Sequence, residues 1–181
     1  MQRKRIQRTC VLAGLTAMLV TVALAAKDRF TVVAANGITF AEFRGYDSWQ
    51  PVAPSQTDDR LKVITANPEM IKAYQEGFPG NGKAVPDGAK FAKVEWTAKK
   101  DPESPYPVLV PDTLKRVGFM IKDSKRFPET DGWGYAQFVY DAASDTFTPE
   151  TNDPQFGKKV CHSCHTLVTA KDFVFTEYPK W

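Results

Sequence analysis

The chain has 181 residues, with 24 Lys and Arg against 21 Asp and Glu, which gives a formal net charge of +3. No basic patch with interleaved aromatic residues accompanies this small excess, so the sequence gives no indication of nucleic-acid binding. Three cysteines in a chain of this length are too few for a disulfide-stabilised scaffold.

The first 25 residues have the pattern of a secretory signal peptide. Four basic residues and no acidic one precede an apolar run over residues 11–24, which ends in Ala23-Leu24-Ala25, a small-x-small cleavage pattern. The alternative is an uncleaved anchor, because the run is nearly long enough to span a bilayer. Cleavage would remove four of the 24 basic residues and leave 20 against 21 acidic ones. The sequence therefore predicts export to the periplasm and a single domain over residues 26–181.

The rest of the chain predicts a few helices and several strands. Aromatic residues spaced by three favour a helix over residues 36–49, and Asn67-Pro68-Glu69 is a helix start with a capping Asn followed by Pro. Strict alternation from Lys90 to Ala98 is typical of a strand. Further strands are expected over residues 60–65, 116–122 and 133–140, a polar loop over 51–59, and irregular structure over 149–158. The predicted fold is α+β, a mostly antiparallel β-sheet with a few packing helices.

The most specific motif lies near the C-terminus, in Cys161-His162-Ser163-Cys164-His165. This is the Cys-x-x-Cys-His pattern of covalent c-type haem attachment. Two thiols at this spacing can add to the two vinyl groups of one haem, and the following histidine then serves as the axial iron ligand. The sequence therefore predicts one covalent haem c per chain, joined to Cys161 and Cys164 and ligated by His165.

Three other interpretations of the motif were weighed. A thioredoxin-like redox pair requires a βαβ pattern around it, and none is present. A structural zinc site requires four ligands, usually in two separated pairs, whereas residues 26–181 contain no further Cys or His. A simple disulfide would leave the adjacent histidine unexplained.

Few residues of the chain could ligate the iron on the side opposite His165. His162 and His165 are the only histidines, so a distal histidine is not available unless His162 folds back. Met70 and Met120 could ligate the iron, as in electron-transfer cytochromes c, but both occur in apolar stretches that favour core packing. An open sixth position is the favoured interpretation, and it predicts chemistry on a small ligand.

The chain resembles the cytochrome P-460 family, which includes the cytochromes c′-beta. The resemblance rests on the order of several short segments: Asn67-Pro68, Pro86-Asp87-Gly88, Phe91-Ala92-Lys93-Val94-Glu95-Trp96, Asp123-Ser124-Lys125-Arg126-Phe127-Pro128 and Gly132-Trp133-Gly134-Tyr135-Ala136, followed by the haem motif. It implies a mostly antiparallel β fold, a homodimer and one pentacoordinate haem c per chain.

The resemblance also implies a lysine joined to a meso carbon of the porphyrin, and Lys93 matches by its position in the strand. A lysine pressed against haem is desolvated, which lowers its pKa and makes the neutral amine nucleophilic. The alternative is a solvated lysine on the polar face of an alternating strand. Lys90 and Lys83 are the other candidates.

Three functions are open to an exported haem site of this kind, and the first two are those that the resemblance implies. The first is hydroxylamine oxidation, with Glu95 or Asp123 as proton acceptor and a soluble cytochrome c as electron acceptor. The second is nitric oxide binding without turnover, in a pocket capped by aromatic side chains. The third, less favoured, is plain electron transfer with a methionine on the iron. The candidates for the aromatic cap are Phe40, Phe43, Phe91 and Phe119.

Overall fold

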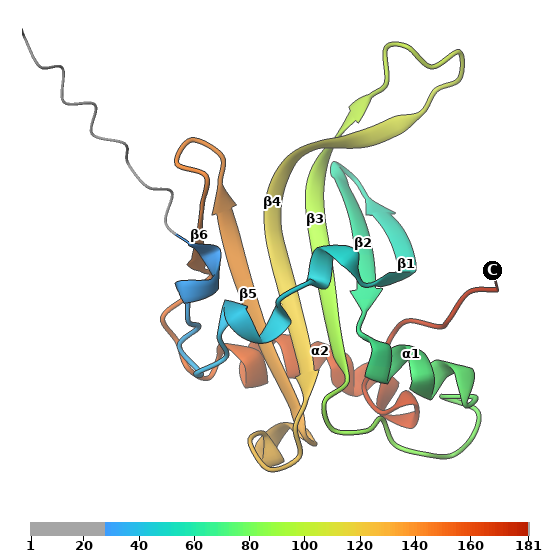
Figure 1. Cartoon of the computed structure of the whole chain (residues 1–181), viewed down its shortest axis with the longest axis vertical. Coiled ribbons are helices and arrows are strands. Elements are labelled where there is room, and N and C mark those ends of the chain that lie inside the picture. Colours follow the sequence, from blue (N-terminus) through green and yellow to red (C-terminus); the bar gives the residue numbers. More distant parts are fainter. Residues whose placement is uncertain (1–27, 181) are drawn as a thin grey trace, which may run out of the picture.

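The structure is a computed structural model of the chain and describes residues 28–180. Six antiparallel strands form one sheet in sequence order, with short helical segments before, between and after them (Figure 1). The predicted α+β class is confirmed. The strands are β1 (Gln50–Thr57), β2 (Arg60–Ala66), β3 (Lys90–Lys100), β4 (Leu109–Lys122), β5 (Trp133–Asp141) and β6 (Thr146–Pro149); the α-helices are α1 (Pro68–Gln75) and α2 (Ser163–His165).

Helix α1 begins where the sequence predicts it. The side chain of Asn67 accepts a hydrogen bond from the main-chain N–H of Met70 at 3.2 Å. The same oxygen accepts from the N–H of Lys90 at 2.8 Å, and the amide group donates to the carbonyl of Gly88 at 2.9 Å. Asn67 therefore caps the helix and also ties it to the start of β3.

Three sequence predictions of secondary structure are wrong. The helix expected over residues 36–49 is two short 3-10 segments, because Gly45 separates them with a left-handed φ of 84°. The loop expected over residues 51–59 contains most of β1, whose two prolines are accommodated because β1 is an edge strand. The stretch expected to be irregular over residues 149–158 begins with the last residue of a sixth strand, β6, which the sequence did not predict.

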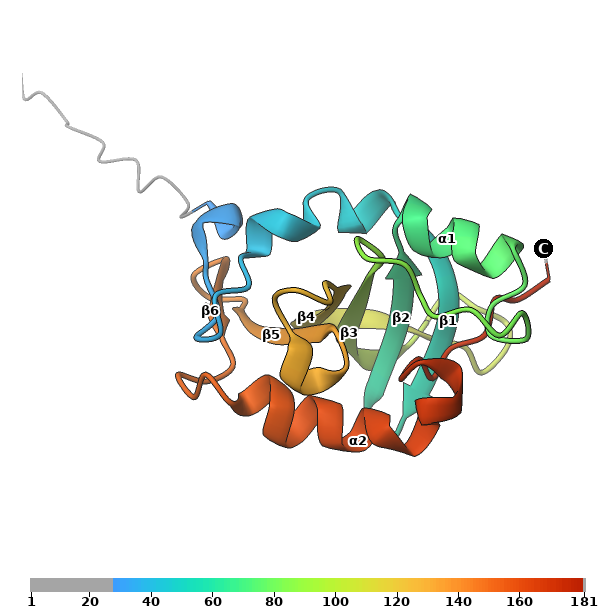
Figure 2. The same cartoon turned by 90° about the horizontal axis from the view of Figure 1, so that it is seen from below.

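The sheet is covered on both faces, and each face has its own core. Phe91, Met120 and Tyr135 are partners in register across β3, β4 and β5, and they belong to the core beneath α1 and the C-terminal segment. Their neighbours point the other way and pack against the N-terminal segment. Figure 2 shows the N-terminal segment and the C-terminal helical segment on opposite sides of the sheet.

A close approach across the N-terminal face makes Gly134 a sensitive position in β5. A Cβ atom placed on Gly134 would overlap the ring of Phe127. We expect Gly134→Ala to lower the free energy of unfolding by about 1–3 kcal/mol, because overpacking displaces the ring or the strand. Chemical denaturation followed by circular dichroism measures this loss. Gly80→Ala is the matched control, since its nearest atom lies at an ordinary 3.5 Å; equal losses in the two variants would refute the overpacking argument.

The predicted signal peptide, residues 1–25, lies outside the described residues, so its cleavage and the boundary of the domain stay predictions. Within residues 28–180, no helix is long and apolar enough to cross a membrane.

Candidate functional site

The predicted haem motif lies on a helical segment that packs against β5. This segment starts with a π-helical turn (Gly157–His162), continues through α2 and ends at Lys171. A Cβ atom on Gly157 would lie only 3.0 Å from the carbonyl oxygen of Tyr135, so glycine permits this close contact between helix and strand. The contact sets the motif over one face of the sheet.

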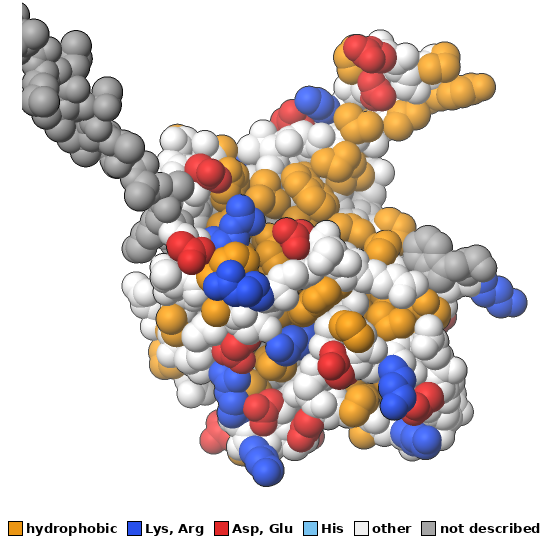
Figure 3. All heavy atoms as spheres, in the orientation of Figure 1, with side chains coloured by type: hydrophobic (Ala, Val, Ile, Leu, Met, Phe, Trp, Pro, Cys, Tyr) orange, Lys and Arg blue, Asp and Glu red, His pale blue; other side chains and the backbone are white. Residues whose placement is uncertain are grey.

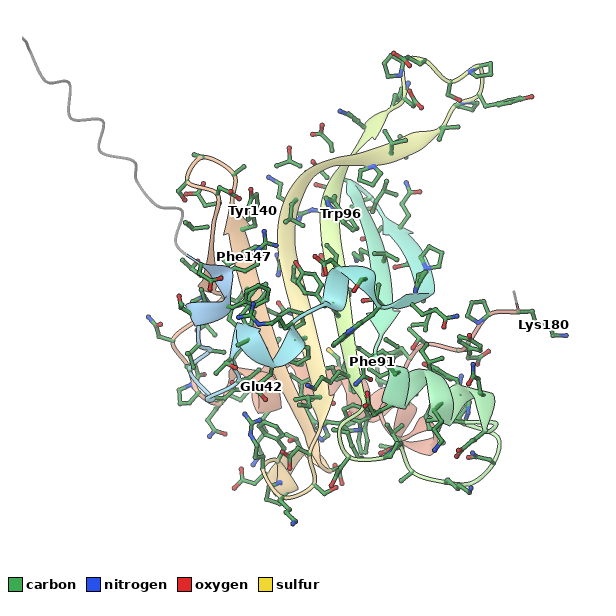
Figure 4. All side chains as sticks on the ribbon, in the orientation of Figure 1. Glu42, Phe91, Trp96, Tyr140, Phe147 and Lys180 are labelled. Atoms are coloured by element: carbon green, nitrogen blue, oxygen red, sulfur yellow. The ribbon has the colours of Figure 1, made fainter. Side chains whose placement is uncertain are left out.

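A cavity of about 380 Å³ lies between the sheet and the helical segment. It brings Lys93 together with Cys161, Cys164 and His165, although Lys93 is far from the motif in the sequence. Most other lining residues are apolar. They include Ile64, Phe91, Met120, Tyr135, Val160, Val174 and Phe175; Figure 4 labels Phe91 on β3.

One ring nitrogen of His165, Nδ1, is engaged in a hydrogen bond. Its Nδ1 atom lies 2.6 Å from the carbonyl oxygen of Phe173, so Nδ1 carries the proton and donates it. Burial lowers the pKa of His165, while the Phe173 carbonyl acts in the opposite direction. The rings of Tyr135 and Phe175 flank the imidazole with centroids at 5.0 Å. A neutral imidazole with Nδ1 fixed leaves Nε2 as the metal-binding atom.

The two motif cysteines are free thiols at the edge of the cavity. Cys161 is half-buried and Cys164 is exposed. Burial raises the pKa of the Cys161 thiol to about 11, whereas a dithiol redox pair requires a lowered pKa. In residues 28–180, no group of three or more His, Cys, Asp or Glu is arranged to hold a metal ion. The raised pKa of the Cys161 thiol weighs against the thioredoxin-like interpretation.

Lys93 reaches the cavity from the middle of β3. It pairs in register with Gly118, and its Cε would lie 3.7 Å from a Cβ placed there, so the lysine stem crosses a position without a side chain. Its Nζ lies 3.0 Å from Oε1 of Glu95, and the side chain is 37% exposed. The other two candidates do not border this cavity. Lys90 Nζ donates to the carbonyl of Glu42 on the opposite face, and Lys83 lies in an exposed turn.

The two methionines differ in position. Met70 is fully buried in the core beneath α1 and does not border the cavity, as core packing predicts. Met120 borders the cavity from β4 and is 8% exposed. Of the two, Met120 is therefore the one whose thioether could reach a bound group.

Three of the four residues expected to form an aromatic cap have their rings on the opposite face of the sheet. Phe40 and Phe43 lie in the core on the opposite face of the sheet, and the ring of Phe119 stacks on that of Phe43 with centroids 4.0 Å apart. The prediction was wrong for these residues because Phe119 and Phe91 occupy opposite faces of the sheet. Phe119 borders the cavity but packs its ring into the opposite core, so of the four residues only Phe91 has its ring in the core on the cavity side.

Two acidic residues lie beside the cavity rather than in its lining. Glu95 is 7% exposed and contacts Lys93. Glu150, which follows β6, has a buried Oε2 atom 3.3 Å from Nη1 of Arg116, without a hydrogen bond from any described residue. Glu150 has no local signal in the sequence, because its position depends on β6, which the sequence pattern does not predict. Asp123, in contrast, caps a turn by accepting from two main-chain N–H groups, so it is not part of the site.

The residues present fit a covalently attached haem. Both thiols, a neutral histidine with a free Nε2 and an apolar wall border one cavity. These features match a planar apolar group tethered at one edge and ligated from one side.

The family comparison agrees with this geometry. The family model described as Cytochrome P460 matches residues 43–176, which is more than half of the chain and includes the motif and Lys93. No curated protein shows significant similarity to the chain. The haem motif, the cavity around it and the extent of this match together establish that the chain belongs to the cytochrome P460 family of haem proteins.

Proposed function

We propose that the chain is an exported mono-haem c-type cytochrome that oxidises hydroxylamine. Cys161 and Cys164 would form the two thioether bonds, and His165 would ligate the iron. The observation that carries the proposal is that Lys93 borders the same cavity as both thiols and the histidine. When bound, haem supplies the redox centre at which a nitrogen substrate binds and loses electrons.

Lys93 is positioned to become part of the bound group. A bond between its Nζ and a porphyrin meso carbon would replace one N–H and one C–H bond, and an external two-electron oxidant would take up the two electrons released with the two protons. The lysine must first lose its extra proton to become a nucleophile. The Glu95 carboxylate, 3.0 Å from Nζ, is the nearest acceptor in the described structure.

Hydroxylamine oxidation requires the same acidic groups after attachment. Removing an electron pair from hydroxylamine releases two protons, and carboxylates near the site can accept them. Glu95 is connected to Glu150 through Arg116, whose guanidinium lies 4.0 Å from the first and 3.3 Å from the second. Because an arginine guanidinium stays protonated, Arg116 does not carry protons itself; its positive charge holds the two carboxylates beside the cavity. The electrons would leave to a soluble cytochrome c.

A second function, nitric oxide binding without turnover, is favoured by one observation. None of the residues lining the described cavity is Asp or Glu, and the wall is mostly apolar. Such a wall suits a small neutral ligand. The two functions differ in whether Glu95 can exchange protons with the bound molecule.

The first experiment is to produce the protein in a periplasm with haem maturation and measure its denatured mass, ferrous spectrum and hydroxylamine-dependent reduction of an acceptor. A mass increased by one haem, a red-shifted Soret band and turnover would support the enzyme. Attached haem with an ordinary high-spin spectrum, no turnover and nitric oxide binding would favour the gas-binding alternative. A low-spin spectrum that Met120→Leu abolishes would overturn both in favour of electron transfer.

The proton acceptor has its own test. We expect Glu95→Gln to lower kcat for hydroxylamine by about 10²–10⁴-fold, the usual effect of losing a general base. Asp123→Asn is the matched control, because Asp123 caps a turn away from the cavity. Equal kcat values for Glu95→Gln and the wild type would show that Glu95 does not take the proton.

We also propose that two copies of the chain associate. The long hairpin between β3 and β4 projects from the sheet (Figure 1), and apolar side chains gather at its end (Figure 3). Tyr106 is 74% exposed there, beside Val108 and Leu109. Exposed apolar residues grouped in this way favour a protein contact. Sedimentation equilibrium of the wild type and Tyr106→Ser measures whether the hairpin holds a dimer together.

A further inference from the structure

A buried lysine at the end of β4 is connected to both histidines of the motif. Lys122 is only 6% exposed, and its Nζ lies 2.9 and 3.0 Å from the two carboxylate oxygens of Asp172. The same Nζ donates to the carbonyl oxygen of Asp131 at 3.0 Å and lies 4.9 Å from the centre of the Trp133 ring. A lysine ammonium has three donors, so these contacts account for its hydrogen-bonding capacity.

The first connection runs through Asp172 to the predicted iron ligand. Asp172 and Phe173 form a turn in which both residues, neither of them glycine, have left-handed φ values of 44° and 64°. Such a backbone persists only where its surroundings hold it. Lys122 holds the carboxylate of Asp172, Trp133 Nε1 donates to its carbonyl at 2.9 Å, and the N–H of Val85 donates to its side chain at 2.8 Å. The turn presents the Phe173 carbonyl to His165.

The second connection runs through Asp131 to the other histidine. Asp131 occupies a left-handed turn whose carbonyl accepts from Lys122. Its Oδ2 lies 3.2 Å from Nε2 of His162, and Nδ1 of His162 lies 3.3 Å from the hydroxyl of Tyr135. Lys122 therefore joins the two turns that hold His162 and His165.

We propose that Lys122 and Asp172 are positioning residues for the iron ligand. Their ion pair fixes the turn at Phe173, so its carbonyl oxygen accepts a hydrogen bond from the Nδ1–H group of His165 at 2.6 Å. A histidine that donates strongly through Nδ1 is a more basic ligand through Nε2, which stabilises ferric over ferrous iron. The inference rests on the proposed haem attachment, and Lys122 itself is not among the residues that border the cavity.

The test compares reduction potentials in the haem-loaded protein. We expect the double variant Lys122→Met/Asp172→Asn, which removes the pair without leaving an unpaired buried charge, to shift the ferric-to-ferrous ratio at fixed potential about tenfold toward ferrous. That ratio corresponds to about 59 mV in a redox titration. The iron–histidine stretching band of the ferrous protein should move to lower frequency. Asp172→Asn alone, which keeps an acceptor for Val85, is expected to shift both readouts in the same direction and is measured if the double variant does not fold.

Lys159→Met is the matched control. Lys159 lies on the same helical segment as the motif, but its ion pair with Asp153 is exposed, so its removal should leave both readouts unchanged. Potential and stretching band equal to wild type in the Lys122 and Asp172 variants, with haem attached, would overturn the inference. A wild-type protein whose denatured mass shows no haem would instead overturn the proposed function.

Discussion

Replacing both motif cysteines, in Cys161→Ala/Cys164→Ala, is expected to abolish covalent attachment completely. The wild type should retain one haem mass after denaturation, whereas the double variant should show none, because these are the two thiols at the cavity edge. Denaturing mass spectrometry of protein matured in a periplasm measures this directly.

The single variants sharpen the same test. Cys161→Ala and Cys164→Ala should each leave one thioether bond, and the difference should be visible in the pyridine haemochrome spectrum. Cys164 is exposed while Cys161 is half-buried, so we expect loss of Cys161 to cost more folded stability. Haem that stays bound through denaturation in Cys161→Ala/Cys164→Ala/Lys93→Arg, where the proposed lysine cross-link is also removed, would contradict attachment through this motif.

Replacing Lys93 with arginine is expected to have the second large effect. Arginine keeps the positive charge facing Glu95 but lacks a nucleophilic amine. The ferrous Soret band of Lys93→Arg should therefore lie at the position of an ordinary c haem, and hydroxylamine turnover should fall by at least about tenfold, as for loss of a group that tunes the metal. Ferrous absorption spectra and steady-state rates measure the two changes.

Lys90→Arg is the control for this prediction. Lys90 lies on the same strand, but its Nζ donates to the carbonyl of Glu42 on the opposite face. Its replacement should leave the Soret band unchanged. A red-shifted band that persists in Lys93→Arg and disappears in Lys90→Arg would identify Lys90 as the cross-linked residue. A red-shifted band that persists in both variants would exclude both lysines.

The surroundings of Lys93 indicate whether haem attachment or cross-linking comes first. Its Nζ is paired with Glu95 and more than a third of the side chain is exposed. The lysine is thus partly solvated in the described structure, and a group filling the cavity would desolvate it. We therefore expect the cross-link to form after haem attachment. If the oxidant is omitted during maturation, we expect a protein with attached haem but no cross-link. Its ferrous Soret band should lie at the position of an ordinary c haem.

Several features of this protein were determined by the sequence itself, because their signals are local. The haem motif places two thiols and a histidine within five residues, so no long-range contact is needed to bring them together. Helix α1 begins at Pro68 because Asn67 caps it, and the alternation from residue 90 to 98 encodes a two-sided strand. These short-range patterns were enough to predict the class of fold.

Other features were decided only by the tertiary structure, because they depend on register and on which edge of the sheet a strand occupies. The segment β1 can be a strand despite its prolines because it lies at the edge of the sheet. Glu150 lies beside Arg116 because β6, which precedes it, pairs with β5. Register placed Lys93 on the face of the cysteines and Phe119 on the other face, and a shift of one residue would reverse both. The contact between Lys122 and Asp172 joins residues 50 positions apart, and no periodicity within either segment encodes it.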